Sequence, residues 1–212
     1  MTAYWYLTRG SGAVTLILLT ITVALGIANV QRVRTATVPR FALQALHRNV
    51  SLLAVAFLVV HVATTLLDSY VPIHLVDAII PFGATYRPFW LGLGAVASDM
   101  VLALVLTSLV RGRLGYRAWR ATHWLAYASW PIALLHSIGT GSDAGATWMV
   151  VILIACAAVM ATAVIARIAQ SLGESPGQSP SPPHYEHPPQ SGRPARIAHG
   201  HVPVSERRTA PV

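Results

Sequence analysis

The chain has few charged residues and almost no cysteine, and each shortage argues against a class of protein. Charged residues make up 10% of its 212 residues, whereas soluble domains average about 25%. So little polar surface cannot cover a fold in water, which argues against a soluble globular protein. The single cysteine, Cys156, excludes a disulfide framework, a CxxCH haem attachment and a cysteine-ligated iron–sulfur cluster.

Lysine is absent, so all 15 basic residues are arginines, and the net charge is +8. These arginines fall in short clusters between apolar runs, which is typical of a membrane protein. We therefore expect no nucleic-acid partner despite the positive charge. What the chain has in abundance is apolar residues, at 54% of the total with a mean hydropathy of +0.56.

Five apolar stretches are long enough to cross a bilayer, which takes about 20 residues. A span in lipid must satisfy its own backbone hydrogen bonds, so each is expected to be a helix. The sequence thus predicts an all-α fold, a polytopic membrane helix bundle with five transmembrane helices in contact with lipid. The expected spans cover about residues 12–30, 43–67, 89–110, 121–138 and 147–166.

Arginine placement predicts the orientation of the bundle, because cytoplasmic loops carry an excess of basic residues. The N-terminus is expected outside and the C-terminus in the cytoplasm, with the protein in the cell (plasma) membrane. Arg9, which precedes the first span on the outer side, is the exception. The arginines that carry the prediction follow the first, third and fifth spans: Arg32, Arg34, Arg40, Arg48, Arg111, Arg113, Arg117, Arg120 and Arg167.

The end of the chain differs in composition from the rest. Residues 173–212 contain 9 of the 14 prolines, interspersed with Ser, Gln, Gly and Arg. Such a segment buries too little apolar surface to offset its ordering entropy. We therefore expect a membrane domain over residues 1–170 and a disordered Pro/Ser/Arg-rich cytoplasmic tail over residues 171–212.

Four of the nine histidines lie in the second and fourth expected spans, as His47 with His61 and His123 with His136. Each separation of 14 or 13 residues covers about 20 Å of helix. Because both spans run from inside to outside, His47 and His123 share the cytoplasmic depth, whereas His61 and His136 share the outer depth. Two imidazoles at each depth are what six-coordinate haem iron requires. The pattern predicts two haems, the inner on His47/His123 and the outer on His61/His136.

The angular phase of the histidines fits one span better than the other. At about 100° per residue, 14 residues return to within about 40° of the starting direction, whereas 13 residues miss it by about 140°. Pro131 lies between His123 and His136 and is expected to kink or rewind that helix.

Three other interpretations remain open. A histidine relay that transports protons or metal ions would show ion flux and no visible chromophore. The histidines could instead make structural hydrogen bonds between helices. A membrane anchor whose tail recruits partners would lose function when residues 173–212 are deleted. Only haem ligation requires two matched pairs at two depths.

Three segments carry a resemblance to a known family. They are WRATHWLAYASWPIALLHSIGTGSD at Trp119–Asp143, LHRNVSLLAVAFLVVH at Leu46–His61 and TSLVR at Thr107–Arg111. Over about residues 10–169 the chain resembles the ferric reductase-like transmembrane domain family. That family includes ferric reductases, the haem core of NADPH oxidases and the haem subunit of the bacterial methionine-sulfoxide repair system. The resemblance implies two bis-histidine b-type haems stacked across the membrane and electron transfer between its faces.

The chain departs from many members of this family in having no GxGxxG fingerprint or strand–helix alternation for a flavin and nicotinamide domain. We therefore expect an oxidoreductase subunit in which flavin is possible only through a partner. Its electron donor would be a separate cytoplasmic protein or a quinol, and its acceptor would be extracytoplasmic.

Three charged residues complete the candidate site. Arg48 follows His47 and Arg120 precedes His123 by three residues, so both are candidate partners for the inner haem propionates. Anchoring by positive-inside charge explains them equally well. Asp99 lies within the third expected span, where a carboxylate is costly. It is a candidate acceptor for the Nδ1–H of a ligand histidine, a protonatable group or a structural contact between helices.

Overall fold

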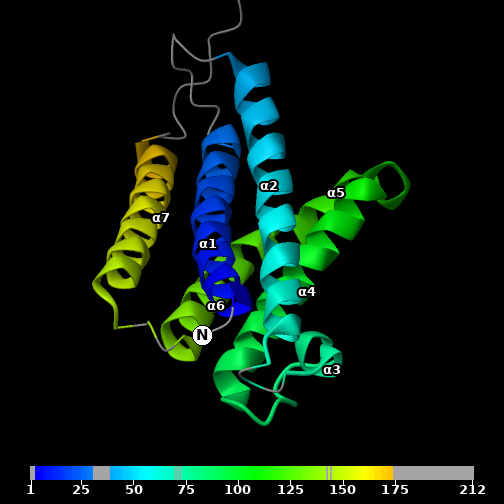
Figure 1. Ribbon diagram of the computed structural model, residues 1–212. Coiled ribbons are helices and arrows are strands. Elements are labelled where there is room, and N and C mark those ends of the chain that lie inside the picture. Colours follow the sequence, from blue (N-terminus) through cyan, green and yellow to red (C-terminus); the bar gives the residue numbers. More distant parts are fainter. Residues whose placement is uncertain are drawn as a thin grey trace, which may run out of the picture. The chain divides into compact units, whose positions relative to one another are not determined.

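The structure is a computed structural model, and the residues it describes form seven helices and no strands, as an all-α fold requires. In Figure 1, α7, α1 and α2 stand side by side, and α4 and α6 cross behind them. The structure describes residues 3–30, 39–69, 71, 73–141, 143 and 145–173.

Four helices are long and apolar enough to cross a membrane: α1 (Ala3–Val30), α2 (Arg40–Leu67), α4 (Pro88–Leu109) and α7 (Thr147–Gly173). Their apolar side chains face outward more than inward. In α2, for example, only 11% of an 18-residue window with mean hydropathy 2.4 is buried inside the molecule. In water such a surface would be unstable, whereas hydrocarbon solvates it.

The expected span over residues 121–138 differs from the other four. It falls on the end of α5 (Arg111–His123) and on α6 (Leu125–Thr140), which has 16 residues and is about 24 Å long at 1.5 Å per residue. The backbone of α5 is also broken at Gly115, where φ is 75° and ψ is 159°. Five membrane-crossing helices are therefore not confirmed, and four are found in the described residues.

The helix between His123 and His136 is interrupted at Trp124, a position that the sequence did not single out. Trp124 donates its backbone N–H to the carbonyl of Ala121 at 3.2 Å, and Tyr127 donates to the carbonyl of Trp124 at 3.0 Å. These three-residue steps wind the chain more tightly than an α-helix does. By contrast, α6 continues through Pro131 without a break.

One hydrogen bond ties the end of α6 that carries His136 to the start of α4. Arg87, in a left-handed conformation just before α4, donates from Nη1 to the carbonyl of Gly139 at 2.5 Å. Pro88 then begins α4, where its missing N–H costs nothing. Before this point the chain forms the short helix α3 (Leu75–Ile79), which Asp77 caps by accepting the His74 backbone N–H at 2.9 Å.

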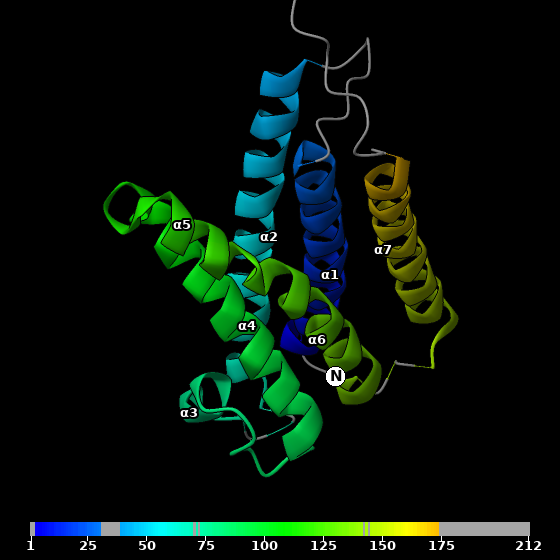
Figure 2. The same ribbon diagram turned by 180° about the vertical axis from the view of Figure 1, so that it is seen from behind.

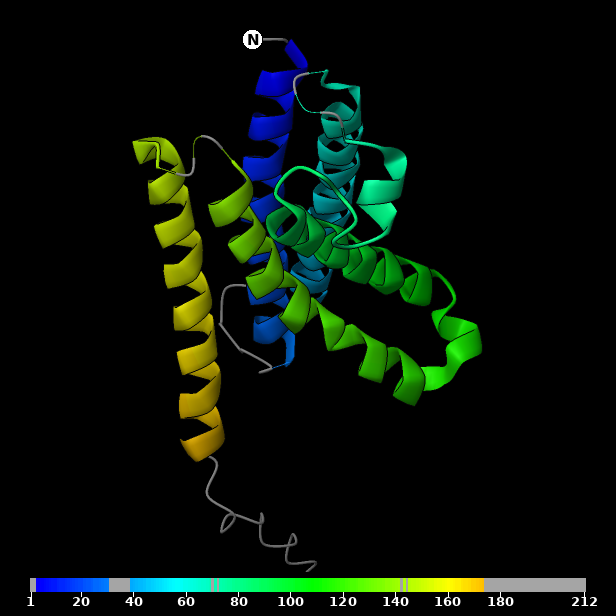
Figure 3. The same ribbon diagram turned by 90° about the horizontal axis from the view of Figure 1, so that it is seen from below.

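Helix α1 lies at the centre of the packing, against α2, α6 and α7, while α4 packs against α6 (Figures 2 and 3). Val23 and Ile27 of α1 form a small apolar core with Met160 of α7. Beside it, Trp130 of α6 donates its indole N–H to the hydroxyl of Thr20 at 2.8 Å. This contact joins α1 to α6, the helix that carries His136.

The expected disordered tail over residues 171–212 lies outside the described residues, apart from 171–173. Those three residues form the end of α7, so this helix runs past the expected boundary at residue 170. Arg32 and Arg34, which support the predicted orientation, also lie outside the described residues.

Candidate functional site

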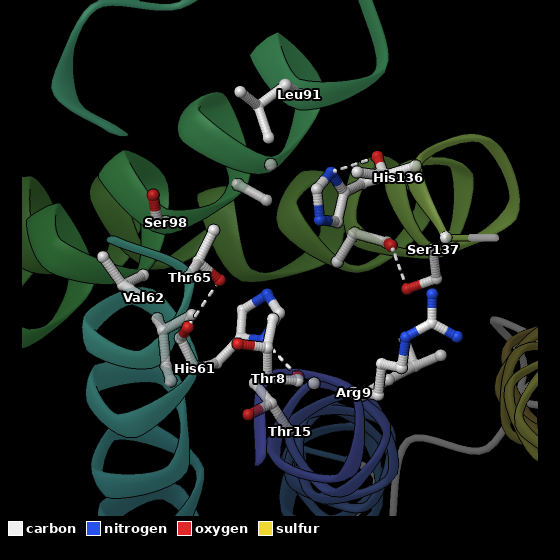
Figure 4. Close-up of a pocket in the computed structure, with 18 of the residues that line it drawn as sticks. Thr8, Arg9, Thr15, His61, Val62, Thr65, Leu91, Ser98, His136 and Ser137 are labelled. Carbon is white, nitrogen blue, oxygen red and sulfur yellow. Dashed lines mark hydrogen bonds between the residues drawn. The ribbon is translucent and has the colours of Figure 1, made fainter. Parts of the chain in front are cut away.

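His61 of α2 and His136 of α6 face one another across a cavity (Figure 4). Their ring centroids are 6.4 Å apart and their ring planes are inclined at 81°. The cavity has a volume of about 370 Å³, within the range of about 300–1,000 Å³ that ligand pockets occupy. Residues of α1, α2, α4 and α6 all line it.

Both rings are oriented by backbone carbonyls on neighbouring helices. Nδ1 of His61 lies 2.8 Å from the carbonyl oxygen of Thr8, and Nδ1 of His136 lies 2.8 Å from that of Trp90. Since a carbonyl oxygen only accepts, each Nδ1 must be the protonated nitrogen of its ring. The lone pair of each Nε2 is then available as a ligand, the arrangement that metal-binding histidines usually adopt.

The spacing of the two rings suits a metal held between them. An imidazole nitrogen bonds a first-row metal at about 2.0–2.1 Å and lies about 1.1 Å from its ring centroid, so two rings on opposite sides of one metal have centroids about 6.3 Å apart. The observed separation is 6.4 Å. This pair therefore fits the axial ligand set of a bis-histidine haem.

The second pair, His47 and His123, is arranged less symmetrically. Nδ1 of His47 lies 3.1 Å from the carbonyl oxygen of Thr22. The ring of His123 stacks on Trp119 of its own helix, with centroids 4.9 Å apart and an interplanar angle of 27°. Within the described part of the chain, the buried Nδ1 of His123 has no hydrogen-bond partner.

The structure brings the rings of His61 and His136 together, whereas the pairing of His47 with His123 stays a prediction. Arg48 and Arg120, the predicted propionate partners, have exposed side chains. Among the described residues no group of three or more His, Cys, Asp or Glu side chains could hold a metal ion by itself. A haem iron would need only two protein ligands at each level, because the porphyrin supplies the other four.

Comparison with known proteins identifies the family. A family model described as "Ferric reductase like transmembrane component" matches residues 11–134, more than half of the chain. The chain belongs to this family. It is accordingly a multi-pass membrane protein. No curated protein and no solved structure matches the chain.

The match to the ferric reductase-like family covers most of the histidine site. Its range runs from α1 into α6 and includes His47, His61 and His123. His136 lies two residues beyond the end of the match, yet in the structure it faces His61.

Sequence reasoning missed the groups that orient the histidines. It named Asp99 as a candidate acceptor, but the acceptors for His47, His61 and His136 are carbonyls in α1 and α4. A backbone carbonyl exists at every position, so residue type alone gave no sign of which ones would be used. Asp99 is half-buried in α4.

Arg9, the exception to the predicted orientation, lines the cavity between His61 and His136. It forms an ion pair with Asp143, and its guanidinium carbon lies 3.8 Å from the ring centroid of Trp5. An arginine in a partly apolar wall is stabilised by such a carboxylate and aromatic face. Its failure to fit the charge pattern was the signal that could have marked it as a site residue.

Proposed function

We propose that this protein is the electron-transferring membrane subunit of an oxidoreductase and holds two b-type haems. Membership of the ferric reductase-like family supports a membrane oxidoreductase-type role. The observation that carries the haem assignment is the 6.4 Å separation of His61 and His136 across a cavity, with each Nδ1 engaged by a carbonyl.

In this proposal His61 and His136 hold the outer haem, and His47 and His123 hold the inner one. When bound, each haem supplies a one-electron couple whose potential depends on its ligands and surroundings. The protein's own contribution is to hold two neutral imidazoles per level with Nε2 directed inward. A haem held by two histidines would have no free position for oxygen, so such a site would suit electron transfer.

The arginines near each level are proposed to balance the haem carboxylates. Arg48 follows His47 in α2, and Arg120 lies one turn before His123 in α5, so both belong to the inner level. Their exposed side chains can extend to a carboxylate at the membrane surface. At the outer level Arg9 lines the cavity itself.

We further propose that α6 is a fifth crossing segment, extended by residues 121–123 at the end of α5. The 16 residues of α6 alone fall short of the usual length, but residues 121–140 together reach about 20 residues. With five crossings the N-terminus lies outside and the C-terminus in the cytoplasm of a cell whose plasma membrane holds the protein. Arg111, Arg113, Arg117 and Arg120 then face the cytoplasm.

The electron donor is proposed to be a separate cytoplasmic protein or a quinol, with any flavin supplied by a partner. The acceptor lies on the extracytoplasmic side. The basis for the position of the acceptor is that the loop residues Asp68, Tyr86 and Asp143 line the cavity between His61 and His136.

A histidine relay for protons is less compatible with the observed hydrogen bonds. A relay passes a proton in at one ring nitrogen and out at the other, so both nitrogens must face groups that exchange protons. Nδ1 of His47 and Nδ1 of His61 each face a backbone carbonyl, which cannot take up and release a proton at neutral pH. Nδ1 of His136 faces the carbonyl of Trp90 and also lies 3.1 Å from the hydroxyl of Thr140.

The test is a reduced-minus-oxidised spectrum of the purified full chain, with a pyridine haemochrome count. Two b-type haems per chain are expected. Purified protein with no haem Soret band, together with proton or metal flux in liposomes, would overturn the proposal in favour of the relay.

A further inference from the structure

Three of the four site histidines make the same two contacts with a neighbouring helix. Nδ1 forms a hydrogen bond with the backbone carbonyl of one residue, and the ring packs over a glycine four residues further along that helix. These carbonyl and glycine pairs are Thr8 and Gly12 at His61, Thr22 and Gly26 at His47, and Trp90 and Gly94 at His136.

In α1 and α2 the contact repeats with a fixed period. Gly12 and Gly26 are 14 residues apart on α1, and His61 and His47 are 14 residues apart on α2. The two helices run antiparallel, so one helical register produces both contacts. The glycine spacing therefore follows the histidine spacing, which packing of small residues alone would not require.

The ring of each histidine occupies the space that a side chain on the glycine would fill. A Cβ atom at Gly94 would lie 2.5 Å from Cε1 and 2.6 Å from Nδ1 of His136. At Gly12 it would lie 2.9 Å from the same two atoms of His61. At Gly26 the nearest atom, Cε1 of His47, would be 3.6 Å away, an ordinary contact.

Geometry explains why glycine stands four residues after the carbonyl. In an α-helix the carbonyl of one residue receives the N–H of the residue four positions later, so these two groups lie side by side. A side chain on the later residue would cover the carbonyl, whereas glycine leaves it open to a second donor. Glycine is otherwise unfavourable inside a helix.

We propose that Gly12 and Gly94, and more weakly Gly26, are positioning residues for the haem ligands. Each leaves a carbonyl accessible, and that carbonyl fixes the tautomer and direction of one imidazole. This inference rests on the proposed function. Partners of this kind typically change metal affinity by about 10–100-fold when they are lost.

The test compares Gly94→Ala, Gly12→Ala and Gly26→Ala with Gly10→Ala in the full chain. Gly10 is a matched control, because a Cβ there meets nothing within 4 Å. Haem affinity of each level is measured by titration, and the ferric haems are examined by electron paramagnetic resonance, whose low-spin signals report the angle between ligand planes. That angle is 81° at the outer level.

We expect Gly94→Ala to have the largest effect and Gly12→Ala the next, both confined to the outer haem, with about a tenfold or greater loss of affinity. Gly26→Ala should fold normally and shift only the inner signal slightly. Unchanged signals in Gly94→Ala and Gly12→Ala would overturn the inference. So would equal loss of both haems, the result expected if the glycines serve helix packing alone.

The wild-type chain separates this inference from the proposed function. Wild-type protein without haem refutes the proposed function itself. Wild-type protein with two haems, combined with glycine variants that match Gly10→Ala, refutes only the positioning role.

Discussion

The two proposed haem levels each contain one histidine from α2 and one from α5 or α6, yet the imidazole rings are held differently at the two levels. At the outer level, carbonyls on α1 and α4 orient His61 and His136. At the inner level a carbonyl orients only His47, while the Nδ1 of His123 has no partner among the described residues.

The difference follows from where each histidine lies in its helix. His136 sits within α6, against α4 at Gly94. His123 is the last residue of α5, beside the irregular winding at Trp124, and its ring stacks on Trp119 of its own helix. An imidazole ring is thus held in a fixed orientation when it hydrogen-bonds to a backbone carbonyl of a second helix.

Single histidine substitutions should have the largest effect, because each should remove the haem of one level and leave the other. His61→Ala and His136→Ala should each abolish the outer haem and leave the inner one, because one axial bond cannot hold the group as two do. His47→Ala and His123→Ala should do the reverse. The pyridine haemochrome count falls from two haems per chain to one, and redox titration identifies which component is lost.

His74→Ala is the matched control for these variants. His74 lies at the start of α3 and does not line the cavity, so two haems should remain. Loss of both haems in every site variant would contradict the assignment of separate levels.

The second prediction concerns the strength of the two sites. Because the inner level lacks one carbonyl partner, the inner haem should dissociate at least about tenfold faster than the outer haem. Transfer to an excess of an apo-haem protein, followed by absorbance, measures both rates in the wild-type chain. Equal rates, or faster release of the outer haem, would show that the missing hydrogen bond has no consequence.

Most of the helical architecture could be predicted from the sequence, because apolar length alone specifies a helix in lipid. The expected spans at residues 43–67 and 89–110 match α2 and α4 closely, whereas α7 begins as expected at residue 147 and continues seven residues past 166. The prediction of one continuous helix over residues 121–138 was wrong, because the apolar pattern gives no sign of the irregular winding at Trp124.

The contact between His61 and His136 could be predicted from the sequence, because spacing and topology place these two side chains at a common depth. The acceptors could not, because every residue carries a carbonyl and only packing decides which is reached. The glycines offered a usable signal: Gly12 and Gly26 repeat at the 14-residue interval of His47 and His61.

The third prediction tests the arginines assigned to the inner level. Arg48→Gln or Arg120→Gln should lower the midpoint potential of the inner haem, because a nearby positive charge favours the more negative, reduced state. A shift of about 30–60 mV is expected, since 59 mV is tenfold for one electron. Potentiometric titration at low and high salt measures the shift, which salt should reduce because both side chains are exposed.

Arg113→Gln is the control, since Arg113 lies ten residues before His123. Equal shifts in all three variants would indicate a general charge effect. Absence of any shift in Arg48→Gln and Arg120→Gln would leave these arginines as membrane anchors only.

The smallest expected effect comes from a contact that belongs to neither level. Trp130→Phe removes the indole donor to Thr20, which joins α6 to α1 between the two histidine pairs. Unfolding free energy in detergent should fall by about 1 kcal/mol, the usual net value of one hydrogen bond. Thr20 still donates to the carbonyl of Leu16 at 2.7 Å, so its hydroxyl keeps one partner.

Thr20→Val should lower the unfolding free energy by a similar amount, and the double variant should lower it by less than the sum, because both substitutions remove the same hydrogen bond. Both haems should respond equally; a change confined to one would mean that this bond orients a ligand, and the carbonyl contacts would then not account for the difference between the levels.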